Sequence, residues 1–346
     1  MWRFGRRPGR ASRGADIGAL LVPEAFGADP VLRTACEAVR EGEVESGLPL
    51  LAESREAPEL RVLRAVELGR AAADRPGGVA ALVESGADRA DAVLWLGYAL
   101  LARIPAGAVG GAGASTAERK AASAALHEAG DALEAAAGMR PDDAAPWEGL
   151  QAVATGLDAD REDKDRIWRE IIARAPHLFP AHMTRVRALR PPPGESAGPG
   201  AAEEMFAFAG SVADTAPEGS PLPAVLALAH AEHLRRERDR LRGEGNMDFI
   251  VDGAMGRLYG EAAQELFAFA RDWVARAVPH LRDAQAHHLF GWAFHKAEMT
   301  EAARWHLSAV GGLRCDLPWS LFGRASTEAG RAMAELGVDP ARDPGA

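Results

Sequence analysis

The sequence predicts an all-α protein, and three observations lead to this. Alanine is abundant while β-branched residues are few, a composition that favours helices over sheets. Apolar residues recur with the period of a helix, for example Val93, Leu96 and Leu100 within the range 88–103. Glycine and proline clusters divide the chain into short stretches of this kind. At 346 residues the chain can bury a large core, as one elongated helical array or as two helical lobes.

The N-terminal half predicts a series of short helices. Asp29 and Pro30 are a favourable N-cap and first-turn pair, so a helix is expected from there to about Glu41. An apolar patch within 16–27 precedes it and is expected to pack as a cap on the N-terminal end. Further helices are expected at 48–54, 58–73, 88–103, 116–138, 143–157, 161–174 and 178–190.

A glycine-rich stretch, 105–115, separates two of these helices. It lacks the lysine and the following serine or threonine of a phosphate-binding P-loop, and no strand precedes it. We interpret it as a flexible insertion rather than a phosphate site. No motif in the chain predicts a cofactor, and none is expected.

The stretch 191–200, with sequence PPPGESAGPG, is the strongest boundary in the chain, because its prolines and glycines cannot continue a helix. It predicts an N-terminal helical lobe at 15–190 and a C-terminal helical lobe at 201–337, unless it is a long loop within one array. Helices in the second lobe are expected at 201–215, 221–243, 252–277, 281–298, 300–311 and 319–336.

Both ends of the chain are expected to be disordered, at 1–14 and 338–346. Five arginines fall within the first 14 residues, and no apolar segment follows them as in a signal peptide. The alternative for this basic tail is an arm that contacts an acidic partner, a membrane surface or RNA.

The C-terminal lobe contains a pair of helices joined by a short turn, at 281–298 and 300–311. Gly291 on the first helix and Ala303 on the second are small, so the two helices could approach closely there. This pair resembles a tetratricopeptide repeat (TPR), which has the order Trp-x2-Leu-Gly-x2-Tyr on its first helix and small and aromatic residues on its second. The positions in register are Phe290, Gly291, Phe294, Ala303, Leu307 and Val310.

Weaker matches extend this resemblance over residues 88–335, with interruptions. They comprise Ala129, Leu133, Ala136 and Pro141, then Trp147, Leu150 and Ala154, and then Trp168, Ile171 and Pro176. The sequence departs from the family pattern at Gln151, which replaces the first-helix glycine, and at His287, which replaces the tryptophan. The resemblance implies a TPR-like α-solenoid of antiparallel helical hairpins with irregular repeats.

A second internal similarity suggests a duplication. The sequence Phe-Ala-Phe-Ala at 206–209 recurs at 267–270, and His233 then aligns with His295. The two copies are separated by 61 or 62 residues, a distance that fits one hairpin with a long second helix, or nearly two short repeats.

The composition argues against several kinds of function. The net charge of −10 disfavours nonspecific nucleic-acid binding, which depends on neutralising phosphates. No apolar run approaches the ~20 residues that cross a bilayer. Cys36 and Cys315 could form one disulfide, but two free thiols in a cytoplasmic protein are the preferred interpretation.

Histidines are the only residues that suggest catalytic chemistry. His230 and His233 share one helix face, and stacked hairpins could bring them to His295 as metal ligands. The chain has no HExxH motif, and the simpler interpretation is that these are polar or interior residues of a packed helical array. The tryptophans are likewise better explained by packing between helices than as a platform for nucleic-acid bases.

The preferred function is that of a non-catalytic scaffold. The TPR resemblance implies that first helices line a concave groove, which would bind a protein or peptide segment that is acidic or carries a free C-terminus. A metal-dependent enzyme that uses the histidine cluster of the C-terminal lobe is the alternative, and a purely structural or self-associating protein is a third. The oligomeric state stays open. The predicted partner-binding residues are Arg187, Arg190, Gln285, His288, Trp292, His295 and Lys296.

Overall fold

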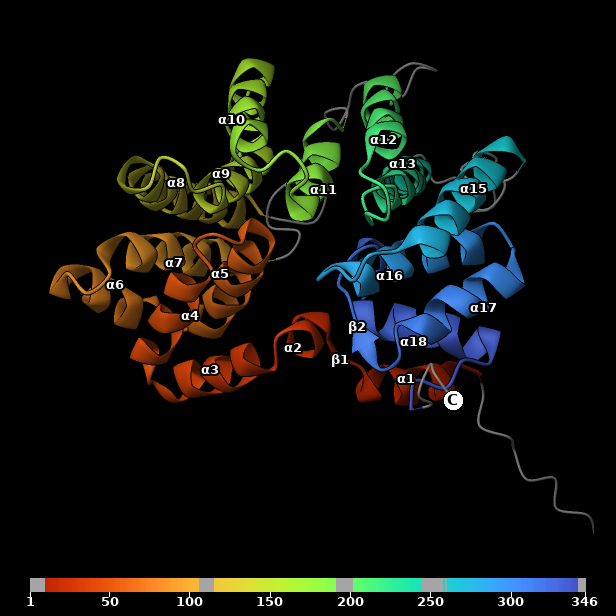
Figure 1. Cartoon of the computed structure of the whole chain (residues 1–346), viewed down its shortest axis with the longest axis horizontal. Helices are drawn as coiled ribbons and strands as arrows, with labels where there is room; N and C mark the ends of the chain where they lie inside the picture. The colour runs from red at the N-terminus through yellow and green to blue at the C-terminus, as the bar shows by residue number, and fades with distance from the viewer. Residues whose placement is uncertain (1–9, 106–114, 191–201, 244–257, 259, 342–346) are drawn as a thin grey trace, which may run out of the picture. The chain divides into compact units, whose positions relative to one another are not determined.

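The computed structural model describes residues 10–105, 115–190, 202–243, 258 and 260–341. This part of the chain is almost entirely helical, apart from loops and two strands of two residues each, so the all-α prediction is confirmed. The chain divides into two compact units, which are described separately (Figure 1). Unit 1 comprises residues 1–27 and 199–346, and unit 2 comprises residues 28–198.

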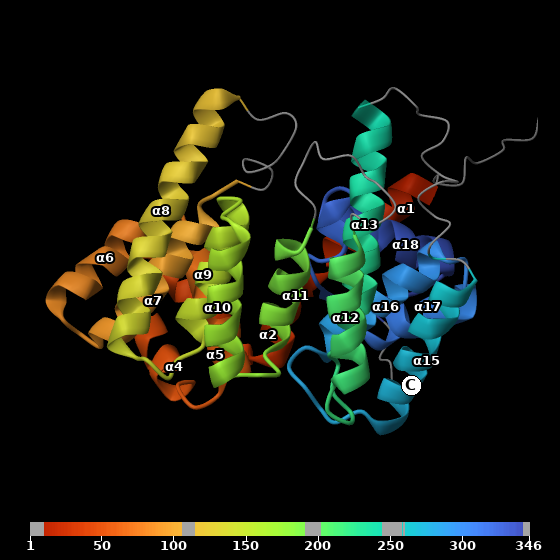
Figure 2. The ribbon, with the colours of Figure 1, turned by 90° about the horizontal axis from the view of Figure 1, so that it is seen from above.

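Unit 2 contains the helices expected for the N-terminal half, with bounds close to the predicted ones. Its central helix α5 packs against α3, α7 and α9, and Figure 2 shows α9 lying between α8 and α10. The elements are α3 (Pro30–Glu41), the 3-10 helix η1 (Val44–Gly47), α4 (Leu48–Glu53), α5 (Pro58–Ala72), α6 (Pro76–Ser85), α7 (Arg89–Ala102), α8 (Thr116–Met139), α9 (Ala145–Gly156), α10 (Arg161–Arg174) and α11 (Phe179–Ala188).

Several helix starts follow from capping side chains. The Asp29 carboxylate accepts a hydrogen bond from the Leu32 amide, and Pro30 occupies the first turn, as predicted. Ser115 and Glu118 form a reciprocal capping box at the start of α8. Asp160 accepts from the Asp163 amide at the start of α10. These bonds satisfy amide groups that a helix leaves without internal partners.

Unit 1 contains the helices expected for the C-terminal lobe, together with an N-terminal segment. Helix α13 packs against α12, α15 and α16, and α16 packs against α17 (Figure 1). The elements are α1 (Arg10–Leu20), β1 (Val22–Pro23), α2 (Glu24–Ala28), α12 (Glu203–Thr215), α13 (Ala224–Gly243), α15 (Glu261–Arg276), α16 (Asp283–Lys296), α17 (Thr300–Ala309), β2 (Leu313–Arg314), the 3-10 helix η2 (Trp319–Leu321) and α18 (Ala325–Leu336).

The N-terminal segment differs from the prediction. Residues 10–14, expected in a disordered tail, are helical in α1, and α1 packs along α18. Gly330 contacts the backbone of Gly14 and Gly18, a close approach that only side-chain-free positions allow. Strand β1 pairs in parallel with β2, so residues 15–27 join the unit of the C-terminal helices rather than the N-terminal lobe.

Other differences are smaller. The helix expected at 319–336 is divided into η2 and α18, since Arg324 between them has an extended backbone. Val338 is buried, so the disordered tail expected from 338 does not begin there. The predicted linker 191–200 and residues 106–114 of the predicted insertion lie outside the described residues. The divisions between the units fall at 27/28 and 198/199.

The hairpin of α16 and α17 has the predicted close contact. A Cβ atom on Gly291 would lie 2.7 Å from Leu307 Cδ2, and Ala303 is completely buried. Gly291 therefore allows the close approach of α17 that its position in the sequence indicates.

Helices α12 and α15, which carry the repeated Phe-Ala-Phe-Ala sequence, bury equivalent positions. Three pairs of positions that lie 61 residues apart are buried in both helices, while Ala207 and Ala268 are exposed in both. The buried pairs are Met205 with Leu266, Ala209 with Ala270, and Val212 with Trp273.

None of the helices in the described ranges combines the length and the apolar character that a membrane crossing requires. Both cysteines are free, with Cys36 in unit 2 and Cys315 in unit 1.

Candidate functional site

Two of the predicted partner-binding residues are enclosed in unit 1. His288 and Trp292 on α16 are both completely buried, and the Trp292 ring stacks on Phe322 with 5.3 Å between ring centroids. Because helix α16 is surrounded by α13, α15 and α17, the side chains on several of its faces are covered. In this structure neither residue forms a surface that a partner could contact, which corrects their assignment to a groove.

His288 instead connects three elements. Its Nδ1 accepts a hydrogen bond from Trp319 Nε1 at 3.0 Å, and its Nε2 lies 3.0 Å from the Leu313 carbonyl oxygen. The indole can only donate, so Nε2 carries the proton and donates to that carbonyl. Burial lowers the pKa of His288 to about 4, which keeps the ring neutral.

The other three predicted residues on α16 are partly exposed. His295 Nε2 lies 3.4 Å from Glu335 Oε2, and burial lowers the pKa of His295 despite that carboxylate. Burial also lowers the pKa of Lys296. Gln285 is half-buried near the start of the helix. These side chains are reachable, but Trp292, which was expected to complete the surface, is inside the protein.

Arg187 and Arg190 belong to unit 2. Both are half-buried, and Arg190 Nε donates to the Arg187 carbonyl at 2.8 Å. Met183, one turn before Arg187 on the same helix, is buried. The seven predicted residues are thus distributed over two units, five on α16 and two at the end of α11.

The histidines of the metal hypothesis lie in aromatic surroundings. The rings of His230 and His233 contact Phe206 edge-on, at 4.9 and 5.7 Å between centroids, and His295 faces Glu335. Among the described residues, no group of three or more histidine, cysteine, aspartate or glutamate side chains is arranged to hold a metal ion.

The two thiols are also enclosed. Burial raises the pKa of Cys36 to about 12. Burial together with the Glu24 carboxylate, to which the Cys315 thiol donates, raises the pKa of Cys315 well above its usual range. Both thiols are therefore protonated at neutral pH and shielded from reagents, which is unlike a reactive cysteine.

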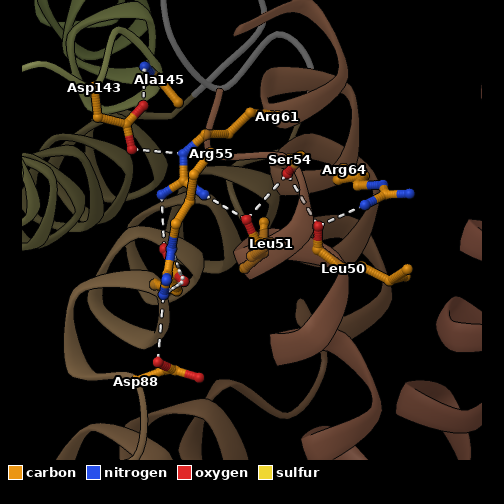
Figure 3. Close-up of polar contacts among 10 residues, drawn as sticks. Leu50, Leu51, Ser54, Arg55, Arg61, Arg64, Asp88, Asp143 and Ala145 are labelled. Carbon is orange, nitrogen blue, oxygen red and sulfur yellow. Dashed lines mark hydrogen bonds and ion pairs between the residues drawn. The ribbon is translucent and has the colours of Figure 1, made fainter. Parts of the chain in front are cut away.

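A buried arginine, which the sequence analysis did not identify, organises the centre of unit 2 (Figure 3). Arg61 is 1% exposed, and its guanidinium donates to Asp143 at 2.5 Å, to Asp91 at 2.7 Å and to the Leu51 carbonyl at 2.7 Å. Arg55 reaches the same Asp91 carboxylate from the protein surface. The three nitrogens of Arg61 are engaged, so this network holds helices together and leaves no group directed at a ligand.

Unit 2 also carries an open depression on α10 and α11, with a volume of about 680 Å³. Trp168 is half-buried at its side, and the Arg185 guanidinium carbon lies 5.8 Å from the centroid of the Trp168 ring. The His182 ring meets Trp168 edge-on at 5.1 Å. The residues that line the depression are Arg161, Glu162, Asp165, Trp168, Arg169 and Arg185.

Arg185 is the most enclosed residue of this lining, with its side chain 6% exposed. Its Nη2 donates to Asp165, and its Nη1 donates to the Lys164 carbonyl at 3.3 Å. Its Nε is buried and has no hydrogen-bond acceptor among the described residues. A buried N–H without an acceptor is costly, and it gives this site an unused donor.

The Asp165 carboxylate lines the depression and pairs with two of its arginines. Asp165 accepts from Arg161 Nε through both oxygens, at 2.8 and 2.9 Å, as well as from Arg185. Partial burial alone would raise the pKa of Asp165, but the hydrogen bonds from the two arginines outweigh it, and the pKa lies below its ordinary value. Arg161 and Arg169 are exposed at the rim.

One signal in the sequence could have identified this surface. Arg161, Asp165 and Arg169 are spaced four residues apart, which places them along one side of the helix at 161–174. Trp168 stands next to this row, but the sequence assigns it to the TPR pattern and to packing between helices. The contribution of Arg185 could not be read from spacing, because it comes from a different helix.

Comparison of the chain with protein-family models, with curated proteins and with solved structures finds no match in any of the three.

Proposed function

We propose that this chain is a non-catalytic binding protein and that the depression on α10 and α11 holds an acidic segment of a protein or peptide. The observation that carries the proposal is the Arg185 guanidinium, which lines an open depression while one of its buried N–H groups lacks an acceptor among the described residues. A guanidinium presents paired N–H groups that match the two oxygens of a carboxylate.

The surroundings of Arg185 support an anionic ligand. Three arginines and two carboxylates line the depression, so this surface is locally basic in a chain whose net charge is −10. Trp168 lines the depression and is half-buried, so the exposed part of its side chain could add apolar contact with a peptide. An extended nucleic acid is a poorer fit, since its binding depends on many cationic contacts and the chain as a whole is acidic.

Fluorescence polarisation with the full chain would test this proposal. The probe is a fluorescein-labelled hexaglutamate peptide, and hexaglutamine is the uncharged comparison. We expect tighter binding of hexaglutamate, and a loss of about tenfold or more for Arg185→Gln and Arg169→Glu, because a hydrogen bond to a charged group contributes about 1.5–3 kcal/mol.

Arg33→Glu is the matched control. Arg33 is an exposed arginine of the same unit, and it lies on α3, outside the depression. Charge reversal there should leave the affinity nearly unchanged. Equal losses for Arg33→Glu and Arg169→Glu would show nonspecific attraction, and equal binding of the two peptides would contradict the proposal.

We also propose that the helices form irregular TPR-like hairpins. Two observations support this: the contact of Gly291 with Leu307 between α16 and α17, and the equivalent buried positions of α12 and α15.

A further inference from the structure

We propose that Asp165 is an internal competitor, which occupies Arg185 until the carboxylate of a bound acidic segment replaces it. This inference rests on the proposed function and specifies how the same site is regulated. It follows from which nitrogen atoms of Arg185 are used and from the unequal exposure of the two partners.

One N–H group of the Arg185 guanidinium, Nε–H, lacks a hydrogen-bond acceptor among the described residues. The Nε–H and Nη2–H groups of an arginine point the same way and form a two-pronged edge that binds both oxygens of one carboxylate. Asp165 accepts from Nη2 through a single oxygen, Oδ1, while Nε is left without an acceptor among the described residues. Asp165 therefore fills half of an edge that a well-placed carboxylate would fill completely.

Asp165 also has a second hydrogen-bond donor, Arg161. Both of its oxygens already accept from Arg161 Nε, and its side chain is 38% exposed, as against 6% for Arg185. Arg161 is 49% exposed and sits on the same helix, one turn before Asp165. A small rotation towards Arg161 would keep the aspartate paired while freeing the edge of Arg185.

The energetic balance favours such an exchange. Asp165 is partly exposed, so water and salt screen its ion pair with Arg185 and that pair contributes less than a fully buried one. Arg185 is more deeply enclosed, and an incoming carboxylate would satisfy its buried Nε–H as well as Nη2–H. The ligand would accept hydrogen bonds from both Nε–H and Nη2–H, while the protein loses only the bond from Nη2 to Asp165.

The inference is tested by comparing Asp165→Asn with Glu162→Gln in the hexaglutamate assay. Both substitutions remove one negative charge from α10 at the depression, but only Asp165 bonds to Arg185. We expect Asp165→Asn to bind the peptide about two- to fivefold more tightly than Glu162→Gln does, the range that corresponds to a partly exposed ion pair. Adding Arg185→Gln should abolish this gain. Circular dichroism would confirm that each variant retains its helical content.

The outcomes separate the inference from the proposed function. If the unmodified chain prefers hexaglutamate to hexaglutamine but Asp165→Asn binds no better than Glu162→Gln, Asp165 is not a competitor and the inference is overturned. If Asp165→Asn binds more weakly, the aspartate positions Arg185 for the ligand, and the inference is again overturned. If no variant prefers hexaglutamate, the proposed function fails, and the inference fails with it.

Discussion

Gly291 and Leu307 face each other so closely that a methyl group on Gly291 would lie 2.7 Å from Leu307 Cδ2. Gly291→Ala should therefore destabilise unit 1 by about 1–3 kcal/mol, because the added carbon forces the helices α16 and α17 apart or distorts the leucine. Urea denaturation followed by circular dichroism would measure this change.

Gly210→Ala is the control for that substitution. Gly210 lies inside α12 of the same unit, and a Cβ atom there would meet nothing within 4 Å. Alanine should stabilise this helix by up to about 1 kcal/mol, since glycine is the poorer helix former. If the two alanine variants change stability in the same direction, the close contact does not determine the packing of α16 and α17.

Arg61→Met should destabilise unit 2 by about 3–5 kcal/mol, because it leaves the buried carboxylate of Asp91 without its most enclosed partner. Arg33→Ala, which removes an exposed arginine paired with Glu37, should change stability by less than about 0.5 kcal/mol. Denaturation midpoints of the two variants would be compared. Similar midpoints would mean that water reaches the Arg61 network and screens it.

Stability should fall as the pH is lowered from about 6.5 to about 4. Burial lowers the pKa values of His287 and His288 to about 4 and that of His306 to about 3, while a histidine in an unfolded chain titrates near 6.5. Between these values the unfolded chain binds protons that the folded chain does not, so stability is complete above about 6.5 and decreases below it. Each histidine contributes up to about 1.4 kcal/mol per pH unit.

The geometry of one histidine pair explains why protonation is unfavourable. Nδ1 of His287 lies 2.9 Å from Nδ1 of His306, so one nitrogen donates and the other accepts, and a second proton would set two N–H groups against each other. Denaturation at a series of pH values should show a shallower dependence of stability on pH for His306→Phe than for the unmodified chain. The same dependence in both would show that other groups cause the acid destabilisation.

The proposed duplication predicts matched responses at equivalent positions. Ala209→Leu and Ala270→Leu should each cost about 1–3 kcal/mol, because both alanines are buried between helices. Ala207→Leu and Ala268→Leu, at exposed positions, should be nearly neutral. A large cost at only one of Ala209 and Ala270 would argue that the two hairpins pack differently.

The helices and their caps could be predicted because they depend on local sequence. Asp29 and Pro30 predict a helix start from adjacent positions in the chain, and Gly291 predicts a close helix contact within one hairpin; the structure has both as expected. The parallel pairing of Val22 with Leu313 could not be foreseen, since two-residue strands that far apart in the sequence leave no periodic pattern.

The site was harder to predict because burial depends on neighbours that the sequence does not identify. Trp292 was assigned to a surface on the basis of one helix face, yet α16 is covered on several faces. Arg61 shows the opposite case. A charged residue normally indicates solvent exposure, but here Asp91 on α7 and Asp143 in the turn before α9 make its burial tolerable. Arg185 could not be identified for the same reason, because its partner Asp165 lies on a different helix.

The two enclosed thiols give the molecule one natural reporter for each unit. Cys36 is fully covered within unit 2, and Cys315 is 2% exposed within unit 1, with no other cysteine in the chain. A thiol reagent can modify either one only when its own unit opens, so the modification rate at each cysteine follows the opening free energy of that unit. Mass spectrometry of the two labelled peptides would therefore reveal, in a single unmodified sample, whether the units unfold together or one before the other.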